Sequence, residues 1–333
     1  MRKLMNFIKK IVIFIQKKIF IFYDLLKSNS YNKKVAIVSC DKWRNKSLED
    51  LYLKHSLNKQ KCKVDIISWE DKTIDYSKYD VIIIRSIWGF QTNITKFKNW
   101  LDMLELKKIK VLNPVSTIKN NYDKKIQFNI LNKYNIRTIK TFFLSINKSI
   151  KSEILNVKLN NNFENNLILL KPTISEGSKD VYLIGDNHYE FNNVININDV
   201  YDKYKNNKSE LMIQPFIKEI LDGEYSICCI NKKITHGIIK YKNAFTKTNI
   251  IKYIPVEKID YKILKIVSKI LNIKEYKNNL FLRIDLVKQK EEFLVMEVEL
   301  LDPSLFLEFV TDRKRRKKIL DFLANQIIEY IKK

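Results

Sequence analysis

Short apolar runs alternate with amphipathic stretches along the first part of the chain. Runs of four to seven residues, bounded by polar residues, are typical of buried strands, and they lie at 35–40, 63–69, 80–86 and 110–113. Between them, the stretches at 48–60 and 94–106 predict helices. Strands that alternate with helices indicate a parallel α/β layer, so residues 34–118 are expected to form a small open-sheet domain.

Farther along the chain the strands lie closer together, with turn residues between them, which favours antiparallel pairing. Strands are expected near 138–144 and at 167–171, 181–184, 211–217, 225–230, 234–241, 280–287 and 293–301. Helices are expected at 123–134, 259–271 and 313–331. The fold class is therefore α/β followed by α+β, with residues 119–333 as a second domain of two α+β parts.

The last two strands carry the strongest chemical signal. Arg283 and Asp285 have the same parity in one strand, and Glu297 and Glu299 have the same parity in the next. The polar segment 288–292 predicts a turn, so a hairpin would bring three carboxylates and one Arg to one face. Carboxylates are rarely buried unless they are paired or bind metal, and hard oxygen ligands without His or Cys suit Mg²⁺. A solvated sheet face with alternating charges is the alternative.

Two lysines are candidates to bind anionic phosphates near this hairpin. Lys171 ends an apolar strand, where its ammonium group could hold a phosphate. Lys124 follows an Asp at the start of a predicted helix, and helix N-termini favour anions. The turn 173–179, with Ser175 and Gly177, could cover phosphates with its backbone amides, although one glycine is a weak signal.

The net charge of +25 raises the question of nucleic-acid binding. Only eight of the 62 basic residues are Arg, the residue best suited to bidentate phosphate and base contacts. Residues 1–34 carry nine basic residues against one acid, and residues 312–333 carry eight against three. These two ends supply about half of the excess, so a Lys-rich surface is expected and nucleic acid is not an expected partner.

The cysteines favour a reducing compartment. The chain has four, none of them in a CxxC pair, and adjacent Cys228 and Cys229 would point to opposite faces of a strand. Cysteines in apolar strands are usually core residues, so a cytoplasmic protein is expected.

Residues 1–33 are expected to form a basic, amphipathic helix. The longest apolar run there is about five residues, far below a membrane span of roughly 20. Lys3, Lys10 and Lys17 are seven apart and would form one stripe beside a broad apolar face. This pattern is typical of a helix on an anionic membrane surface, so residues 1–28 could make peripheral membrane contact. The alternative is a helix packed on the body of the protein.

Seven short motifs occur in a familiar order. They are NYDK (121–124), LILLKP (167–172), SEGS (175–178), MIQPFI (212–217), DGEYS (222–226), RIDLV (283–287) and MEVELLDPS (296–304). Over residues 34–325 the chain resembles the ATP-grasp superfamily, and most closely its glutathione-synthetase branch. Segments CDKW (40–43) and RSIW (85–88) are similar to those of a set of bacterial ATP-grasp proteins. The resemblance implies an ATP-grasp fold behind an N-terminal open-sheet domain.

The resemblance also implies roles for individual residues. Lys124 and Lys171 match the nucleotide-binding lysines, with Ser175 and Gly177 in the phosphate loop. The hinge strand that reads adenine matches Gln214, Pro215, Phe216 and Ile217, and the acid that binds ribose matches Glu224. The magnesium ligands match Asp285, Glu297 and Glu299. Glutathione synthetase has Asn where this chain has Glu299, a substitution that other ATP-grasp branches tolerate. The phosphate loop and residues 242–256 are poor in glycine here.

Several residues are candidates to face the substrates. Arg85 follows a strand at the end where open α/β sheets bind ligands, and with Ser86 and Trp88 it could receive a carboxylate. An internal ion pair is the alternative. Arg283 and Lys240 are the catalytic candidates, Arg283 because it could balance the carboxylates or hold an acyl phosphate. His236 has the same parity as Lys240, and a structural role is its alternative. Asp41 and Trp43 are further substrate-side candidates.

The resulting hypothesis is an ATP- and Mg²⁺-dependent carboxylate–amine ligase that acts through an acyl phosphate on unidentified small-molecule or peptide substrates. Two Mg²⁺ ions are expected, with Mn²⁺ as a possible replacement, and homo-oligomers occur among such relatives. A peptide-modifying ATP-grasp enzyme or a phosphotransferase is a second hypothesis. A membrane- or nucleic-acid-associated binding protein with a degenerate ATP site is a third.

Overall fold

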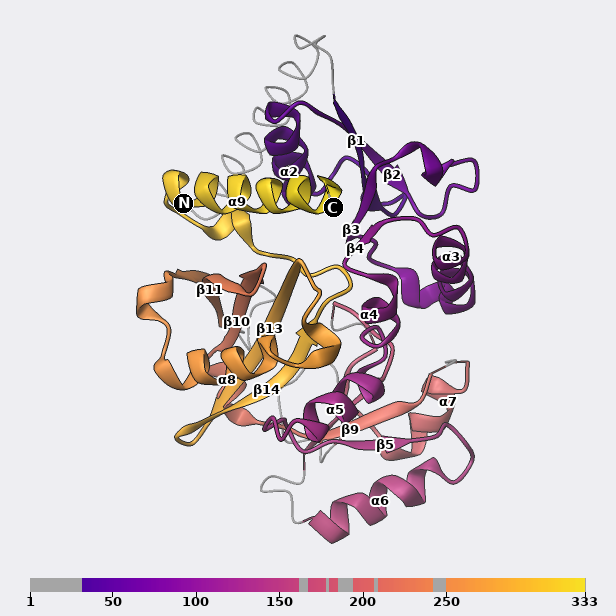
Figure 1. The fold of residues 1–333 in the computed structure, drawn as a ribbon. Coiled ribbons are helices and arrows are strands. Elements are labelled where there is room, and N and C mark those ends of the chain that lie inside the picture. The colour runs from indigo at the N-terminus through magenta and orange to yellow at the C-terminus, as the bar shows by residue number, and fades with distance from the viewer. Residues whose placement is uncertain are drawn as a thin grey trace, which may run out of the picture. The chain divides into compact units, whose positions relative to one another are not determined.

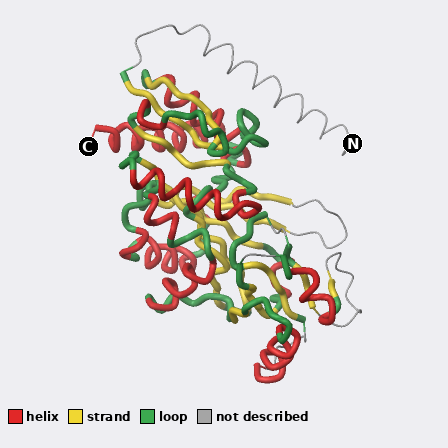
Figure 2. Tube along the Cα trace, turned by 90° about the vertical axis from the view of Figure 1, so that its right-hand side faces the viewer, coloured by secondary structure: helices red, strands yellow, loops and turns green. Residues whose placement is uncertain are grey.

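The computed structural model describes residues 32–161, 167–177, 180–184, 194–206, 209–241 and 250–332, and the remaining residues are drawn in grey (Figures 1 and 2). Residues 1–31 of the helix expected within residues 1–33, and the membrane contact expected from residues 1–28, lie outside this part. Lys33 begins the first strand instead. No helix in the described residues is long and apolar enough to cross a bilayer.

The described chain forms two compact units. Unit 1 contains the residues up to Phe90, Thr95–Val115 and the residues from Asp302 onward, and unit 2 contains Gln91–Ile94 and Ser116–Leu301. The change of unit at Val115 lies close to the boundary expected after residue 118. Unlike the expected second domain, unit 2 ends at Leu301.

Unit 1 is an open parallel sheet with strand order β2-β1-β3-β4. Its strands are β1 (Lys33–Ser39), β2 (Cys62–Ser68), β3 (Val81–Ser86) and β4 (Val111–Leu112). Its helices are α2 (Leu48–Lys59), α3 (Ile94–Leu106) and α9 (Arg313–Lys332), and α4 (Val115–Lys119) follows β4. The parallel α/β layer predicted from the alternation of strands and helices is confirmed.

The C-terminal helix belongs to unit 1 because it packs on α2. Glu49 of α2 accepts hydrogen bonds from the backbone amides of Leu305 and Leu307, at 2.9 and 2.8 Å. The Arg316 guanidinium lies 5.3 Å from the centre of the Tyr52 ring. These contacts depend on residues far apart in sequence, so the strand and helix pattern alone could not assign α9 to this unit.

One sheet of unit 2 has the strand order β5-β9-β6-β7-β8. Its strands are β5 (Phe142–Leu144), β6 (Ile168–Pro172), β7 (Tyr182–Ile184), β8 (Val194–Ile195) and β9 (Leu211–Pro215). The neighbouring helices are α5 (Lys124–Lys133), α6 (Ile150–Asn161) and α7 (Val200–Tyr204). Buried residues of α6, α7 and this sheet, among them Ile154, Tyr204 and Leu170, form one apolar core.

The other sheet of unit 2 is antiparallel, with the order β12-β11-β10-β13-β14. Its strands are β10 (Glu224–Ile230), β11 (Lys233–Tyr241), β12 (Ile250–Ile254), β13 (Phe281–Gln289) and β14 (Glu292–Glu299). Helix α8 (Tyr261–Leu271) covers one face, where Ile263 and Val267 pack with Ile284 and Val298 (Figure 1). The other face carries charged residues beside a smaller apolar cluster.

Seven short 3₁₀ turns complete the described secondary structure: Tyr76–Lys78, Phe90–Asn93, Ile197–Asp199, Lys218–Leu221, Val256–Lys258, Lys274–Tyr276 and Leu307–Phe309.

Candidate active site

The predicted hairpin of the last two strands is present, and its register pairs the expected residues. Arg283 lies opposite Glu299, and Asp285 lies opposite Glu297. Directly opposite residues of an antiparallel pair project to the same side of the sheet, so these four side chains share one face. The turn is tighter than expected, since β13 ends at Gln289 and β14 begins at Glu292.

The same face continues across β10 and β11. Three cross-strand rows run over it: Lys240–Glu224–Val287–Leu294, Ile238–Ser226–Asp285–Glu297 and His236–Cys228–Arg283–Glu299. The predicted common parity of His236 and Lys240 therefore holds, and both lie on the side of the sheet that carries the carboxylates.

Arg283 is the electrostatic centre of this face. Its Nε and Nη2 atoms donate to Oδ1 and Oδ2 of Asp285, each at 2.9 Å, and it also forms an ion pair with Glu299. Ser226 Oγ donates to Asp285 Oδ1 at 2.5 Å. Burial alone would raise the pKa of Asp285, but Arg283 and Lys240 hold that pKa below its ordinary value.

The pKa of Glu299 is shifted in the opposite direction from that of Asp285. Burial raises its pKa, and the nearby negative charges of Glu297 and Asp285 add to the rise, while Arg283 and Lys124 oppose it. The carboxylates are therefore crowded enough that an added positive charge would be favoured among them.

Lys124 connects the phosphate loop to the carboxylates. It is the first residue of α5 and is almost fully buried. Its Nζ lies 3.2 Å from Glu297 Oε1 and donates to the Ser175 carbonyl oxygen at 2.6 Å. Ser175 Oγ in turn donates to the Pro172 carbonyl oxygen at 3.0 Å, and Gly177 adopts a φ of +57°, which favours glycine. The structure thus brings Lys124, Ser175 and Glu297 together.

Lys171 lies on the open face of β6. Residues of β6 alternate between buried and half-buried positions, with Leu170 in the apolar core and Leu169 and Lys171 on the other side. The Lys171 ammonium group is therefore directed away from the core, as expected for a lysine at the end of a buried strand.

The predicted hinge is the end of β9 and the residues after it. Gln214 is buried, and its Nε2 donates to Thr141 Oγ1 at 2.9 Å. Pro215 has no N–H, and the Phe216 amide donates to the Leu167 carbonyl oxygen at 3.0 Å. Among the described residues the Ile217 amide makes no hydrogen bond, so it is the hinge amide best able to read a ligand.

Glu224 and Lys240 form an ion pair on neighbouring strands. Burial disfavours the charged ammonium group, but the negative charges of Asp285 and Glu224 outweigh this effect and raise the pKa of Lys240. Lys240 is therefore a cation on this face.

An apolar cluster occupies the hinge end of the face. Ile139, Ile217 and Val287 are buried there, with Ile220, Leu294 and Met296 packed against them. From Val287 to Arg283 a strand advances about 13 Å. Along this distance the face passes from the row that holds Glu224 and the apolar residues near the hinge to the rows of the carboxylates and Arg283. This order fits an elongated ligand with an apolar group at one end and anionic groups at the other, where those groups could pair with Lys and Arg side chains or a metal ion.

The three expected metal ligands share a face but are not gathered into a metal cage. Among the described residues, no group of three His, Cys, Asp or Glu side chains is arranged to hold a metal ion. Arg283 and Lys124 neutralise the carboxylates instead. Their hard oxygens still suit Mg²⁺, which usually binds one or two carboxylates and completes its shell with phosphates and water.

In unit 1, Arg85 forms an internal ion pair, which was the alternative to its binding a substrate. Its Nη2 lies 2.8 Å from Glu49 Oε2, and its Nε lies 3.9 Å from Asp50 Oδ1. Ser86 is also buried and donates to Asp50, with its Oγ 2.8 Å from Ser39 Oγ. Neither side chain presents a surface to a substrate, because both are buried and pair with the acids of α2.

The two tryptophans that were substrate candidates do meet. The rings of Trp43 and Trp88 pack edge to face with centroids 5.0 Å apart, and both residues are half-buried. Cys40 Sγ donates to the Trp88 carbonyl oxygen at 3.2 Å, which ties the loops after β1 and β3 together. Asp41 is exposed beside them, and its amide donates to Glu70 at 2.8 Å.

His236 is completely buried, in agreement with its structural alternative. Its Nδ1 lies 3.0 Å from Thr235 Oγ1, which itself donates to the Cys228 carbonyl oxygen. The ring is therefore fixed by its own sheet and offers no exposed edge for substrate.

Two residues near the carboxylates were not predicted. Asn121 and Gln127 are buried polar residues whose side-chain amides bond the backbone of β14 beside Glu297 and Glu299. A lone Asn and a lone Gln in an Asn-rich, Lys-rich chain carry no sequence signal for this role.

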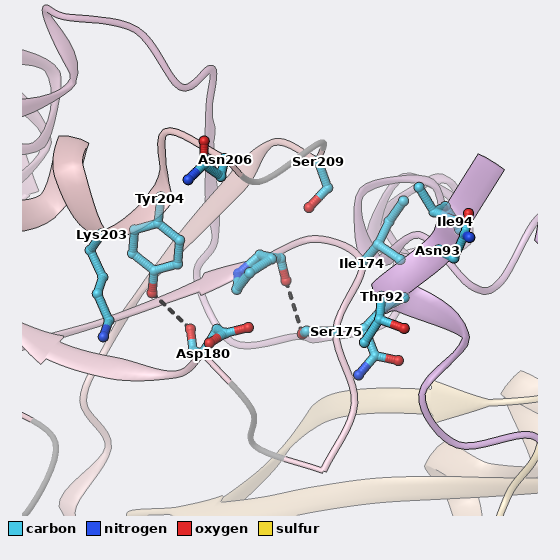
Figure 3. A pocket seen from close by; sticks show the side chains of 12 residues that line it. Thr92, Asn93, Ile94, Ile174, Ser175, Asp180, Lys203, Tyr204, Asn206 and Ser209 are labelled. Atoms are coloured by element: carbon cyan, nitrogen blue, oxygen red, sulfur yellow. Dashed lines mark hydrogen bonds between the residues drawn. The ribbon is translucent and has the colours of Figure 1, made fainter. Parts of the chain in front are cut away.

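A separate hollow of 330 Å³ in unit 2 is lined in part by Ile174 and Ser175 (Figure 3). Polar side chains line most of it, and Tyr204 donates from its hydroxyl to the Asp180 carbonyl oxygen at 2.7 Å. Of the residues predicted to bind nucleotide it contains only Ser175, so it is distinct from the face described above.

Comparison with known proteins identifies the same architecture. The family model for the N-terminal domain of D-cycloserine synthetase DcsG matches residues 35–113. No curated protein matches the chain. The crystal structure of D-cycloserine synthetase DcsG superposes with a TM-score of 0.71 at 18% identity, covering 90% of this chain and 99% of that one.

Two further solved structures are similar. The D-alanine–D-alanine ligase from Bacillus anthracis, complexed with ATP, has a TM-score of 0.61 at 16% identity and covers 90% of this chain and 97% of that one. The ATP-grasp ligase PsnB, complexed with a phosphomimetic variant of its minimal precursor, Mg and ADP, has a TM-score of 0.58 at 10% identity and covers 89% and 98%. The fold that the ordered motifs predicted is therefore confirmed: this chain is a protein of the ATP-grasp fold.

Proposed function

We propose that the protein is an ATP- and Mg²⁺-dependent ligase that joins a carboxylate to an amine through an acyl phosphate. The observation that carries the proposal is the register of β13 and β14, which aligns Arg283 with Glu299 and Asp285 with Glu297 on one face. Lys124 reaches the same carboxylates from α5. Structural elements that are separate in sequence thus converge on one set of charges.

The order of residues along the face supports an orientation for ATP. The adenine would lie at the apolar end, where the Ile217 amide is available. Glu224 would accept from the ribose hydroxyls, in exchange for its pairing with Lys240. The phosphates would then lie near Lys124, Lys171 and the Ser175 loop, where ammonium groups and backbone amides favour anions.

Asp285, Glu297 and Glu299 would hold Mg²⁺ together with the phosphates. When bound, Mg²⁺ supplies charge stabilisation for the transferring phosphoryl group. Their pairing with Arg283 and Lys124 offsets the repulsion among the three neighbouring carboxylates.

The cationic side chains would serve the chemistry directly. The substrate carboxylate attacks the γ-phosphorus of ATP, ADP leaves, and the resulting acyl phosphate is then attacked at its carbonyl carbon by the amine, which releases phosphate. Arg283 is placed to balance the negative charge that accumulates in both steps, and Lys240 is a second cation on the same face.

The similar structures support this reaction class. D-cycloserine synthetase is named for making D-cycloserine, D-alanine–D-alanine ligase is named for joining D-alanine to D-alanine, and the latter structure contains ATP. PsnB, bound with a precursor variant, favours a peptide substrate as the second candidate function. Trp43 and Trp88 are the substrate-side candidates that retain an exposed surface.

Trapping with hydroxylamine tests the proposal. Hydroxylamine attacks acyl phosphates, so incubation with ATP, Mg²⁺ and pools of amino acids or peptides should yield a hydroxamate together with ADP and phosphate. Phosphorylated product without hydroxamate would favour the phosphotransferase alternative. A chain that binds no nucleotide at millimolar ATP would be a degenerate binding protein, and the proposal would fail.

A further inference from the structure

Strand β14 lies at the edge of its sheet, so its outer backbone groups have no strand partner. Such groups cost free energy when they are buried without hydrogen bonds. Near Val295 the backbone of a preceding segment covers this edge: the Val295 amide donates to the Arg137 carbonyl oxygen at 3.0 Å, and the Ile139 amide donates to the Val295 carbonyl oxygen at 3.2 Å. Beyond Val295, side chains take over.

Two buried amide side chains replace the missing strand. Gln127 Oε1 accepts from the Val298 amide at 2.8 Å, and Gln127 Nε2 donates to the Val298 carbonyl oxygen at 2.7 Å. Asn121 Nδ2 donates to the same carbonyl oxygen at 2.7 Å, and Asn121 Oδ1 accepts from the Leu300 amide at 2.8 Å. We call these two residues the amide clamp.

The clamp holds the backbone on both sides of the carboxylates. In an antiparallel edge strand, successive residues direct their backbone groups alternately toward and away from the partner strand. Val298 and Leu300 point outward to the clamp, so Glu297 and Glu299 point inward to β13. The side chain of Val298 is meanwhile buried in the apolar core. Residues 297–300 are therefore held by the clamp at one edge, by β13 at the other and by the apolar core beneath.

The clamp also joins the carboxylates to the lysine of the phosphate loop. Gln127 is three residues after Lys124 on α5, so both lie on one helix face, and Lys124 reaches Glu297. Asn121 is in the turn that precedes this helix. A shift of β14 relative to α5 would change the distance between Lys124 and Glu297 as well as the directions of both glutamates.

We propose that Asn121 and Gln127 are positioning residues that set the geometry of Glu297 and Glu299 for binding a metal–nucleotide complex. This inference rests on the proposed function, because it assigns those glutamates to the metal. The bonds of the clamp go to the backbone of β14, so its effect on the glutamates would pass through that backbone. Partners that orient metal ligands typically change metal affinity 10- to 100-fold when removed.

The experiment measures binding of Mn²⁺ by electron paramagnetic resonance in the presence of ADP, and binding of ADP alone by calorimetry. Gln127→Met keeps the length of the side chain but removes both hydrogen bonds. It is expected to weaken Mn²⁺ binding about 10- to 100-fold while the affinity for ADP alone is unchanged. Asn121→Ala, which keeps the Gln127 bonds to Val298, should show a smaller loss in the same direction.

A buried amide elsewhere in unit 2 provides the matched control. Asn279 is buried just before β13, and its Nδ2 donates to the Tyr276 carbonyl oxygen at 3.0 Å rather than to the backbone of β14. Asn279→Leu should lower thermal stability without a selective change in Mn²⁺ affinity. If Gln127→Met does not fold, Asn121→Ala decides the question.

The outcomes separate the two proposals. If wild type binds Mn²⁺ with ADP and the folded clamp variants bind it equally well, the clamp is only structural and this inference is overturned, while the proposed function stands. Equal losses of ADP and Mn²⁺ affinity would also overturn it, since they would indicate general disorder. If wild type binds neither ligand, the proposed function fails and the inference fails with it.

Discussion

Arg283 is the residue whose removal should disturb unit 2 most sharply. Its side chain is 11% exposed, and it pairs with Asp285 through two hydrogen bonds and with Glu299. Arg283→Met would leave these carboxylates buried with only Lys124 and Lys240 nearby. Removing one member of a buried ion pair costs about 3–5 kcal/mol, because the other charge stays buried and unpaired.

Arg137 offers a matched comparison in the same unit. It forms an ion pair with Glu292, but both side chains are more than half exposed. Such surface pairs contribute about 0–1 kcal/mol, so Arg137→Met should be nearly neutral. Urea unfolding at pH 7, followed by circular dichroism, would compare the free energies of unfolding of the two variants with wild type.

The decrease in the free energy of unfolding caused by Arg283→Met should depend on pH in a predictable direction. In wild type the pKa of Asp285 is below its ordinary value, so its favourable contribution is present at neutral pH and is lost only in strong acid. Without Arg283, burial would raise the pKa values of Asp285 and Glu299, and protonation of the folded state would then relieve the repulsion. The destabilisation should therefore shrink between pH 7 and pH 5. A loss no larger than that of Arg137→Met, or one that grows on acidification, would refute this reasoning.

Three further predictions concern other parts of the chain. Glu297→Gln should lower Mg²⁺-dependent turnover at least about 100-fold with an unchanged circular dichroism spectrum, and near-normal activity would refute its metal role. Burial raises the pKa of Asp50 to about 6, although the nearby Arg85 opposes the rise. The folded protein therefore binds this proton more tightly than the unfolded chain does. The free energy of unfolding should therefore fall by up to about 3 kcal/mol from pH 4 to pH 6, and Asp50→Asn should remove this slope; an unchanged slope would contradict the assignment. Deleting residues 1–28 should weaken binding to anionic liposomes and leave ATP turnover largely unchanged, and full retention of liposome binding would exclude the membrane role.

The parts of the fold that could be predicted are those governed by local pattern. A strand has a period of two, so the parity of Asp285 and Arg283 placed them on one face, and a polar turn implied the hairpin. The structure shows that face and register. In contrast, α6 was missed because its exposed Leu155 and Leu159 blur the apolar stripe formed by Ile150, Ile154 and Val157.

The parts that could not be predicted depend on distant partners. The position of Arg85 at a strand end suggested a ligand, but the structure pairs it with Glu49 and Asp50 of α2. Acids are common in the first turn of any helix, so their sequence positions gave no warning. Asn121 and Gln127 likewise have a role only because the edge of β14 lies beside them. Pattern thus predicts which face a residue occupies, and tertiary packing decides what it meets there.

The central claim is that this face binds ATP with magnesium. Calorimetric titration of ATP into the full chain, with Mg²⁺ and then with excess EDTA, tests it most directly. Binding to one site per chain is expected to be saturable and to strengthen with Mg²⁺, and Glu297→Gln is expected to lose that Mg²⁺ effect. No binding at millimolar ATP, or binding of equal strength with and without Mg²⁺, would contradict it.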